Sequence, residues 1–135
     1  KPEVFGGYSN GCLRNARELA VSNKYWEMVN LQRGRNFGHP DVVPLLQYLG
    51  EHSLQAGHGK LIIGDISQPA GGPMAYGHAS HQLGLDVDIR FDLAKAGERM
   101  NDATRVNYPQ DPVAKQEVVK EIGTYRLRSN LIDKR

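Results

Sequence analysis

The stretch GGPMAYGHASHQLGLDVDI, residues 71–89, joins a glycine-rich approach, a His-x-x-His pair and an alternating pattern of apolar and polar residues. Residues 64–77 contain four glycines and two prolines, so we expect a long loop there. Apolar residues at positions 85, 87, 89 and 91 then alternate with polar ones, which predicts a strand with its apolar side on the core. Asp86 and Asp88 would share the open face of that strand.

The flanking sequence predicts the remaining elements. Pro40 and Asp41 have the residue types of a helix start, and the apolar positions after them predict a helix to about Gln55. Other patterns predict helices over residues 13–21 and 111–125, a strand over residues 60–63, and a strand or helix over residues 26–31. We therefore expect a single α+β domain of 135 residues, in which a small antiparallel sheet carries a metal site and is flanked by helices.

Composition gives no support to two functional classes, nucleic-acid-binding proteins and membrane-spanning proteins. The chain has 17 Lys and Arg against 15 Asp and Glu without a basic block, so its net charge of +2 gives no sign of a nucleic-acid surface. No apolar run approaches the roughly 18 residues that a membrane-spanning helix needs. We expect neither a nucleic-acid partner nor a membrane span.

The residue types of the opening stretch suit a metal ion. Zinc binds imidazole nitrogen and carboxylate oxygen, and a catalytic zinc site typically uses three protein ligands. His81 and Asp88 can converge, because a loop that folds back over a strand brings its histidine to the open face. His78 can face the same site, a second metal or the substrate cleft. The spacing alone leaves a second interpretation open, in which the aspartates face solvent and the histidines are hydrogen-bonding residues of a loop.

Asp65 and Asp86 are candidates for supporting positions beside the metal or in a substrate cleft. Asp65 follows the short apolar strand, where its carboxylate can orient a metal-bound histidine. An Asx-type turn at the strand end explains Asp65 equally well. Asp86 shares the expected open face with Asp88.

Five blocks of this sequence, taken in order, resemble the penicillin-insensitive murein endopeptidases. These enzymes are zinc peptidases of the group that also holds D-Ala-D-Ala dipeptidases and lysostaphin-like enzymes. The blocks lie within residues 6–91 and are SNGC at 9–12, NFGHPD at 36–41, IGD at 63–65, PAGG at 69–72 and GHASHQLGLDVDI at 77–89.

The resemblance implies a zinc ion bound by His81 and Asp88, with His78 near a second metal or at the site rim. It also implies an exported, periplasmic enzyme that hydrolyses the D-alanyl to diaminopimelate cross-links of peptidoglycan. Arg33 and Arg35 then have two interpretations, as solvated loop residues or as partners for carboxylates of a peptidoglycan stem peptide.

Two features depart from the family pattern. The family's His-x-His motif, which supplies the third zinc ligand and a histidine thought to act in catalysis, is missing, because the five histidines lie at 39, 52, 58, 78 and 81. Cys12 matches a family cysteine that pairs with one near the C-terminus, and it is the only cysteine here. We therefore expect the N-terminal part of such an enzyme, completed by a second chain or a missing C-terminal segment. A diverged short protein is the alternative.

These departures leave the catalytic residues unassigned and two other functions open. One is a non-catalytic peptidoglycan-binding or regulatory module that keeps the cleft and lacks the chemistry. The other is a carboxypeptidase that acts on D-alanyl termini of the same polymer.

Overall fold

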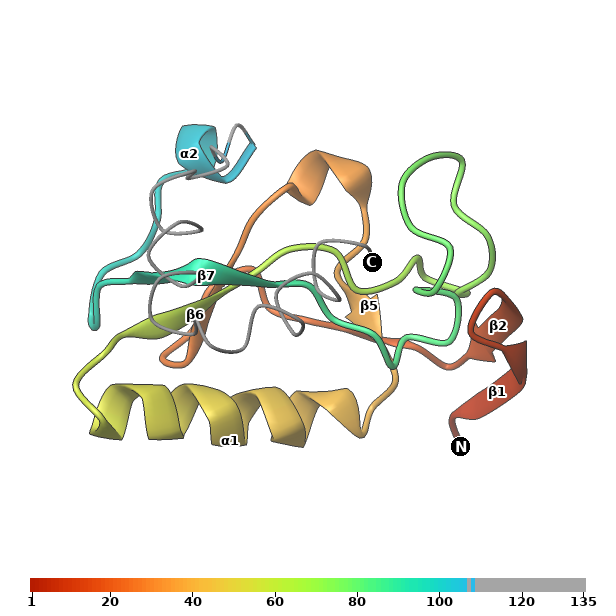
Figure 1. The fold of residues 1–135 in the computed structure, drawn as a ribbon, viewed down its shortest axis with the longest axis horizontal. Coiled ribbons are helices and arrows are strands. Elements are labelled where there is room, and N and C mark those ends of the chain that lie inside the picture. Colours follow the sequence, from red (N-terminus) through yellow and green to blue (C-terminus); the bar gives the residue numbers. More distant parts are fainter. Residues whose placement is uncertain (107, 109–135) are drawn as a thin grey trace, which may run out of the picture.

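The computed structural model describes residues 1–106 and 108, and Figure 1 shows their arrangement. Its central sheet has the strand order β4 (Trp26–Met28), β6 (Lys60–Ile63) and β7 (Ile89–Ala94). β4 pairs with β6 in parallel, with Trp26 opposite Leu61, whereas β6 and β7 are antiparallel, with Lys60 opposite Ala94. The predicted strand over residues 60–63 is therefore the middle strand of the sheet.

Smaller elements surround this sheet. Two antiparallel pairs are formed by β1 (Glu3–Gly7) with β2 (Asn10–Arg14) and by β3 (Arg17–Glu18) with β5 (Phe37–Gly38). The helical elements are η1 (Leu31–Arg33), α1 (Val42–Gln55) and α2 (Asp102–Val106). The predicted α+β class with small antiparallel sheets is confirmed, and the helix predicted over residues 111–125 lies outside the described residues. In the described ranges, no helix combines the length and the apolar character needed to cross a membrane.

Helix α1 and the sheet share the main hydrophobic core. Figure 1 shows α1 running along one side of β6 and β7, and Val42 and Leu46 are the buried apolar residues of the helix. The core joins them to buried side chains from the strands and the segments between them, namely Leu19, Trp26, Met28, Leu61, Ile63 and Ile66. The helix predicted over residues 40–55 is confirmed, and it begins two residues later than predicted. The prediction succeeded because the apolar residues of this segment recur on one helical face.

The helix predicted over residues 13–21 is wrong. Residues 10–14 form β2, and residues 17–18 form β3. Asn15 between them has a φ of 57°, which interrupts any helix. Leu13 on β2 and Leu19, the residue after β3, are both buried, so the apolar spacing reflects burial but gave the wrong element type.

The strand predicted over residues 85–91 begins four residues late. β7 starts at Ile89, and Leu85 is exposed rather than packed on the core. Gly84 precedes this segment and has a φ of 67°. A side chain would not fit at this position, because an added Cβ would lie 2.7 Å from the His39 backbone nitrogen. Residues 85–88 thus lie outside the named strand, and the side chains of the two aspartates contact the histidines of the preceding loop.

A buried ion cluster fastens α2 to the sheet. Glu27 on β4 is fully buried and accepts hydrogen bonds from Ser22, Lys60 and Arg105. Arg105, also fully buried, donates in addition to the carbonyls of Val21, Met28 and Met100. Burial raises the pKa of the Glu27 carboxyl, but the bonds from Lys60, Ser22 and Arg105 outweigh it and lower that pKa below 4.5.

The loop before the histidines depends on a glycine that tolerates no side chain. Gly71 has a φ of 63°, and an added Cβ would lie 2.2 Å from the carbonyl oxygen of Gln82. We expect Gly71→Ala to destabilise the protein by about 1–3 kcal/mol more than Gly57→Ala, because both incur the left-handed dihedral cost and only the former also clashes. Gly57, with a φ of 78°, has no atom within 4 Å of an added Cβ. Urea unfolding followed by Trp26 fluorescence measures both, and equal losses would contradict the clash.

Candidate metal centre

The site lies where β6 ends and β7 begins. Asp65 follows β6 by two residues, and Asp88 immediately precedes β7. The Gly64 amide donates to the Asp88 carbonyl at 2.8 Å, and the Asp88 amide donates to the Asp65 carbonyl at 3.0 Å. This backbone pairing extends the sheet past its named strands and holds the two aspartates side by side. The glycine-rich loop then brings the two histidines to them.

His78, His81 and Asp88 form a group with the geometry of a metal site. One ligand atom from each lies within 4.8 Å of the others. The His78 Nε2 atom is 3.1 Å from Asp88 Oδ2, and the His81 Nε2 atom is 3.5 Å from Asp88 Oδ1. The two imidazole rings are tilted against each other, with their centres 4.2 Å apart. The loop therefore does bring together the three residues that the spacing suggested.

His81 is held in the tautomer that a metal ligand needs. Its Nδ1 atom lies 2.7 Å from the carbonyl oxygen of Ile66, and a carbonyl only accepts, so Nδ1 carries a proton. Nε2 faces the carboxylates of Asp86 and Asp88, and in the neutral ring it is the nitrogen that carries the lone pair for a metal. Burial lowers the pKa of His81, but Asp88, the Ile66 carbonyl and Asp86 outweigh it and raise that pKa above 6.5.

Asp65 is a buried anion that collects three donors on one oxygen. Its Oδ2 atom accepts from Arg35 Nη1 at 2.8 Å, from Arg33 Nη1 at 3.0 Å and from His78 Nε2 at 3.0 Å. Burial raises the pKa of Asp65, but the bonds and charges of the two arginines outweigh it and lower the pKa below its ordinary 3.8. Asp65 is therefore an ionised carboxylate, and in that form it orients the His78 ring.

Arg35 is not the solvated loop residue that one interpretation suggested. Its side chain is 5% exposed, its Nη2 donates to the Tyr76 carbonyl at 2.7 Å, and its guanidinium lies 4.4 Å from the centre of the Tyr76 ring. Arg35 therefore ties Asp65 to the loop just before His78. The sequence placed these arginines in a glycine-containing loop, but no local signal pairs them with a carboxylate 30 residues away.

Asp86 lies beside the metal group. It accepts a hydrogen bond from Ser80 at 2.5 Å, and its Oδ2 atom is 3.9 Å from His81 Nε2.

Two other histidines lie on or next to α1. His39 accepts a hydrogen bond from the Asp41 amide at the start of this helix, and His52 contacts the Tyr48 carbonyl on it. Neither of these two contacts involves the metal group.

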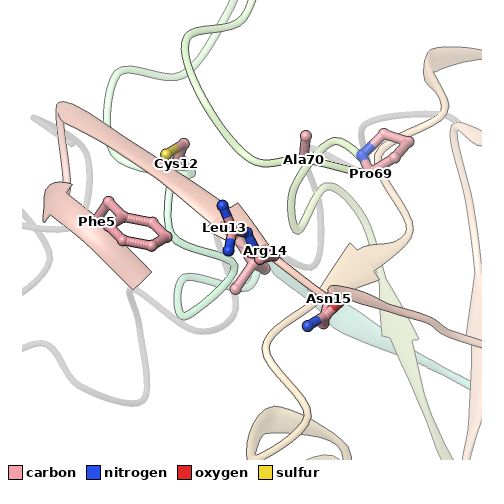
Figure 2. A pocket seen from close by; sticks show the side chains of 7 residues that line it. All are labelled: Phe5, Cys12, Leu13, Arg14, Asn15, Pro69 and Ala70. Atoms are coloured by element: carbon pink, nitrogen blue, oxygen red, sulfur yellow. The ribbon is translucent and has the colours of Figure 1, made fainter. Parts of the chain in front are cut away.

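The hairpin of β1 and β2 is attached to the same loop. The Gly11 amide donates to the Gln82 side chain, and the Leu13 amide donates to the Ala70 carbonyl. Figure 2 shows the pocket of about 510 Å³ beside this attachment, with Phe5 and Cys12 on one side and Pro69 and Ala70 on the other. Its lining is mostly apolar and shares no residue with the metal group, so the pocket and the candidate metal centre are separate features.

The donor set fits zinc. Two imidazole nitrogens and a carboxylate oxygen are ligands that zinc commonly uses, and three protein ligands leave a position for water or substrate. The bond from His81 Nδ1 to the Ile66 carbonyl is the supporting contact that metal-bound histidines usually make through their other ring nitrogen. His78 instead contacts Asp65 through Nε2, the same atom that faces Asp88.

Comparison with known proteins gives a consistent result. Residues 4–131 match the sequence profile of a family described as penicillin-insensitive murein endopeptidase, a longer match than the blocks within residues 6–91. Proteins of that name from Citrobacter koseri and Escherichia coli K12 are 46% and 43% identical over 93 residues, which is 69% of this chain and 34% of each relative. One from Haemophilus influenzae is 38% identical over 107 residues, 79% of this chain and 36% of the relative. The chain thus spans about a third of the length of these relatives.

Proposed function

The chain belongs to the penicillin-insensitive murein endopeptidase family, and on that premise we propose that it takes part in metal-dependent hydrolysis of the peptide cross-links of peptidoglycan. The convergence of His78, His81 and Asp88 within 4.8 Å carries this proposal. We further propose that the metal is zinc, that the bond cleaved joins D-alanine to diaminopimelate, and that the protein works in the periplasm.

The residues divide the work as follows. His81 and Asp88 hold the metal, with His78 as the third ligand of this chain or as a group at the rim. Zinc in such a site supplies Lewis-acid chemistry, which polarises a carbonyl group and makes a water more acidic. Asp65 keeps His78 in place, and the Ile66 carbonyl fixes the ring of His81. Asp86, 42% exposed, would contact water or substrate beside the metal.

A second candidate function follows from the missing His-x-His motif. As the alternative, we propose that this chain binds peptidoglycan without cutting it, since no His-x-His occurs within its 135 residues. A partner chain or a further segment that supplies those histidines would restore the chemistry.

The test is incubation of the 135-residue chain with cross-linked murein and zinc, with EDTA as the control. We expect an EDTA-sensitive loss of dimeric muropeptides, measured by chromatography. Retention on murein without loss of dimers would support the binding module and contradict hydrolysis by this chain. A chain that neither binds murein nor cuts it would contradict both candidate functions.

A further inference from the structure

Arg33 and Arg35 share one carboxylate but differ in surroundings. Both donate through Nη1 to Asp65 Oδ2, and Gly34 between them has a φ of 62°, which allows the tight turn. The Arg35 side chain is 5% exposed and is also bonded to Tyr76. The Arg33 side chain is 32% exposed, and within residues 1–106 its guanidinium has its hydrogen bond and ion pair with Asp65 alone.

The two arginines around Asp65 carry more positive charge than this carboxylate neutralises. Asp65 supplies one negative charge against two guanidinium groups. A buried cation requires a partner, so the carboxylate is committed to Arg35, which has no access to solvent screening. Arg33 shares that carboxylate and is the more exposed of the two guanidinium groups, so it is the one that a further anion can reach. A guanidinium has five N–H donors, and Asp65 engages one of them, so the partly exposed Arg33 side chain has further donors that suit an anion.

The position of this guanidinium relates it to the metal group. His78 Nε2 contacts the same Asp65 oxygen as Arg33 Nη1. Arg33 is therefore separated from the candidate ligand His78 by one carboxylate oxygen. An anionic group bound by Arg33 would lie at the edge of the site, next to the bond presented to the metal.

The proposed substrate has a carboxylate in a matching place. In a D-alanyl to diaminopimelate cross-link, the carbon that bears the amide nitrogen also bears a free carboxylate. Arginine binds carboxylates through two parallel N–H bonds, which fixes orientation as well as affinity. We propose that Arg33 binds the carboxylate on the amine side of the scissile bond and thereby selects free-acid peptides over amidated ones. This inference rests on the proposed function.

The experiment compares two probes that differ in one charge. Diacetyl-L-Lys-D-Ala-D-Ala has one carboxylate, next to its last amide nitrogen, and its C-terminal amide has none. Calorimetric titration of the zinc-supplemented chain is expected to show at least about tenfold tighter binding of the acid, because a single charge-assisted hydrogen bond provides that much and the fork offers two. Arg33→Gln should bind the acid as weakly as the amide, with amide binding unchanged. Arg33→Lys keeps the charge without the fork and should show an intermediate preference.

Controls separate binding from structure. Arg99→Gln removes an equally charged surface side chain, 66% exposed, and should keep the full preference for the acid. Zinc affinity of Arg33→Gln should match that of the unchanged chain, because Arg35 still holds Asp65. A full preference retained in Arg33→Gln, or equal weakening of acid and amide, would overturn this inference alone. Failure of the unchanged chain to bind either peptide or murein would overturn the proposed function and this inference together.

Discussion

Replacing Arg105 by methionine is expected to lower the free energy of unfolding by about 3–5 kcal/mol, because it removes one partner of a fully buried ion pair. Glu27 would keep the bond from Lys60 but would lose its guanidinium. The carbonyls of Val21, Met28 and Met100 would lose their bonds from Arg105 as well, and Val21 would keep the bond from the Met28 amide. Urea unfolding measures the change, and Trp26 on β4, the single tryptophan of the chain, reports it beside Glu27.

A surface arginine provides the matched control. Arg99 pairs with Asp102 at 3.9 Å while both side chains are largely exposed, so Arg99→Met should change the stability by less than about 0.5 kcal/mol. If Arg105→Met lost no more stability than Arg99→Met, the buried cluster would not be what holds α2 to the sheet.

The pH dependence of stability gives an independent check of the same cluster. The pKa of Glu27 is lowered on folding, so its carboxylate stabilises the protein above its unfolded pKa of about 4.5. That contribution is lost as the pH falls through the lower, folded value. Glu27→Gln should therefore flatten the acid side of the stability profile, and an unchanged profile would contradict the role of the carboxylate.

The fold was predictable where its cause is local. Helix α1 follows from a helix-start signal and one apolar face, and β6 follows from a short apolar run. Residues 13–21 were misassigned because pairing with distant residues decides them: Leu13 lies opposite Val4, and Glu18 lies opposite Phe37. The parallel pairing of β4 with β6 is of the same kind, since no local pattern distinguishes it from an antiparallel one.

In the candidate site too, the local part was predictable and the long-range part was not. His78, His81 and Asp88 lie within one short stretch, so their convergence could be inferred from the loop and the strand that follows. The contacts that support them could not. Asp65 takes its arginines from residues about 30 positions earlier, and Glu27 meets Arg105 across 78 residues. Buried charges of this kind need partners, but a sequence does not say which ones.

Replacing His81 by alanine is expected to weaken zinc binding by more than about 100-fold. Removal of a supporting residue typically costs 10- to 100-fold in metal affinity, and loss of a direct ligand should cost more. His81 is 3% exposed and its ring is fixed by the Ile66 carbonyl, so no other imidazole can move into its place without rearranging the loop. Competition with a chromophoric chelator measures the affinity, and unfolding followed by Trp26 fluorescence shows whether each variant stays folded.

Three further variants locate the loss at the metal group rather than in the fold. Asp88→Asn preserves the shape of a half-exposed side chain, 44% accessible, and should weaken zinc binding as strongly as His81→Ala. Asp65→Asn should cost about 10- to 100-fold, because Asp65 acts through His78. His52→Ala, which changes an exposed histidine on α1, should have no effect. Unchanged zinc stoichiometry and affinity in His81→Ala would show that these side chains converge for another reason, and the metal-dependent function would fall with them.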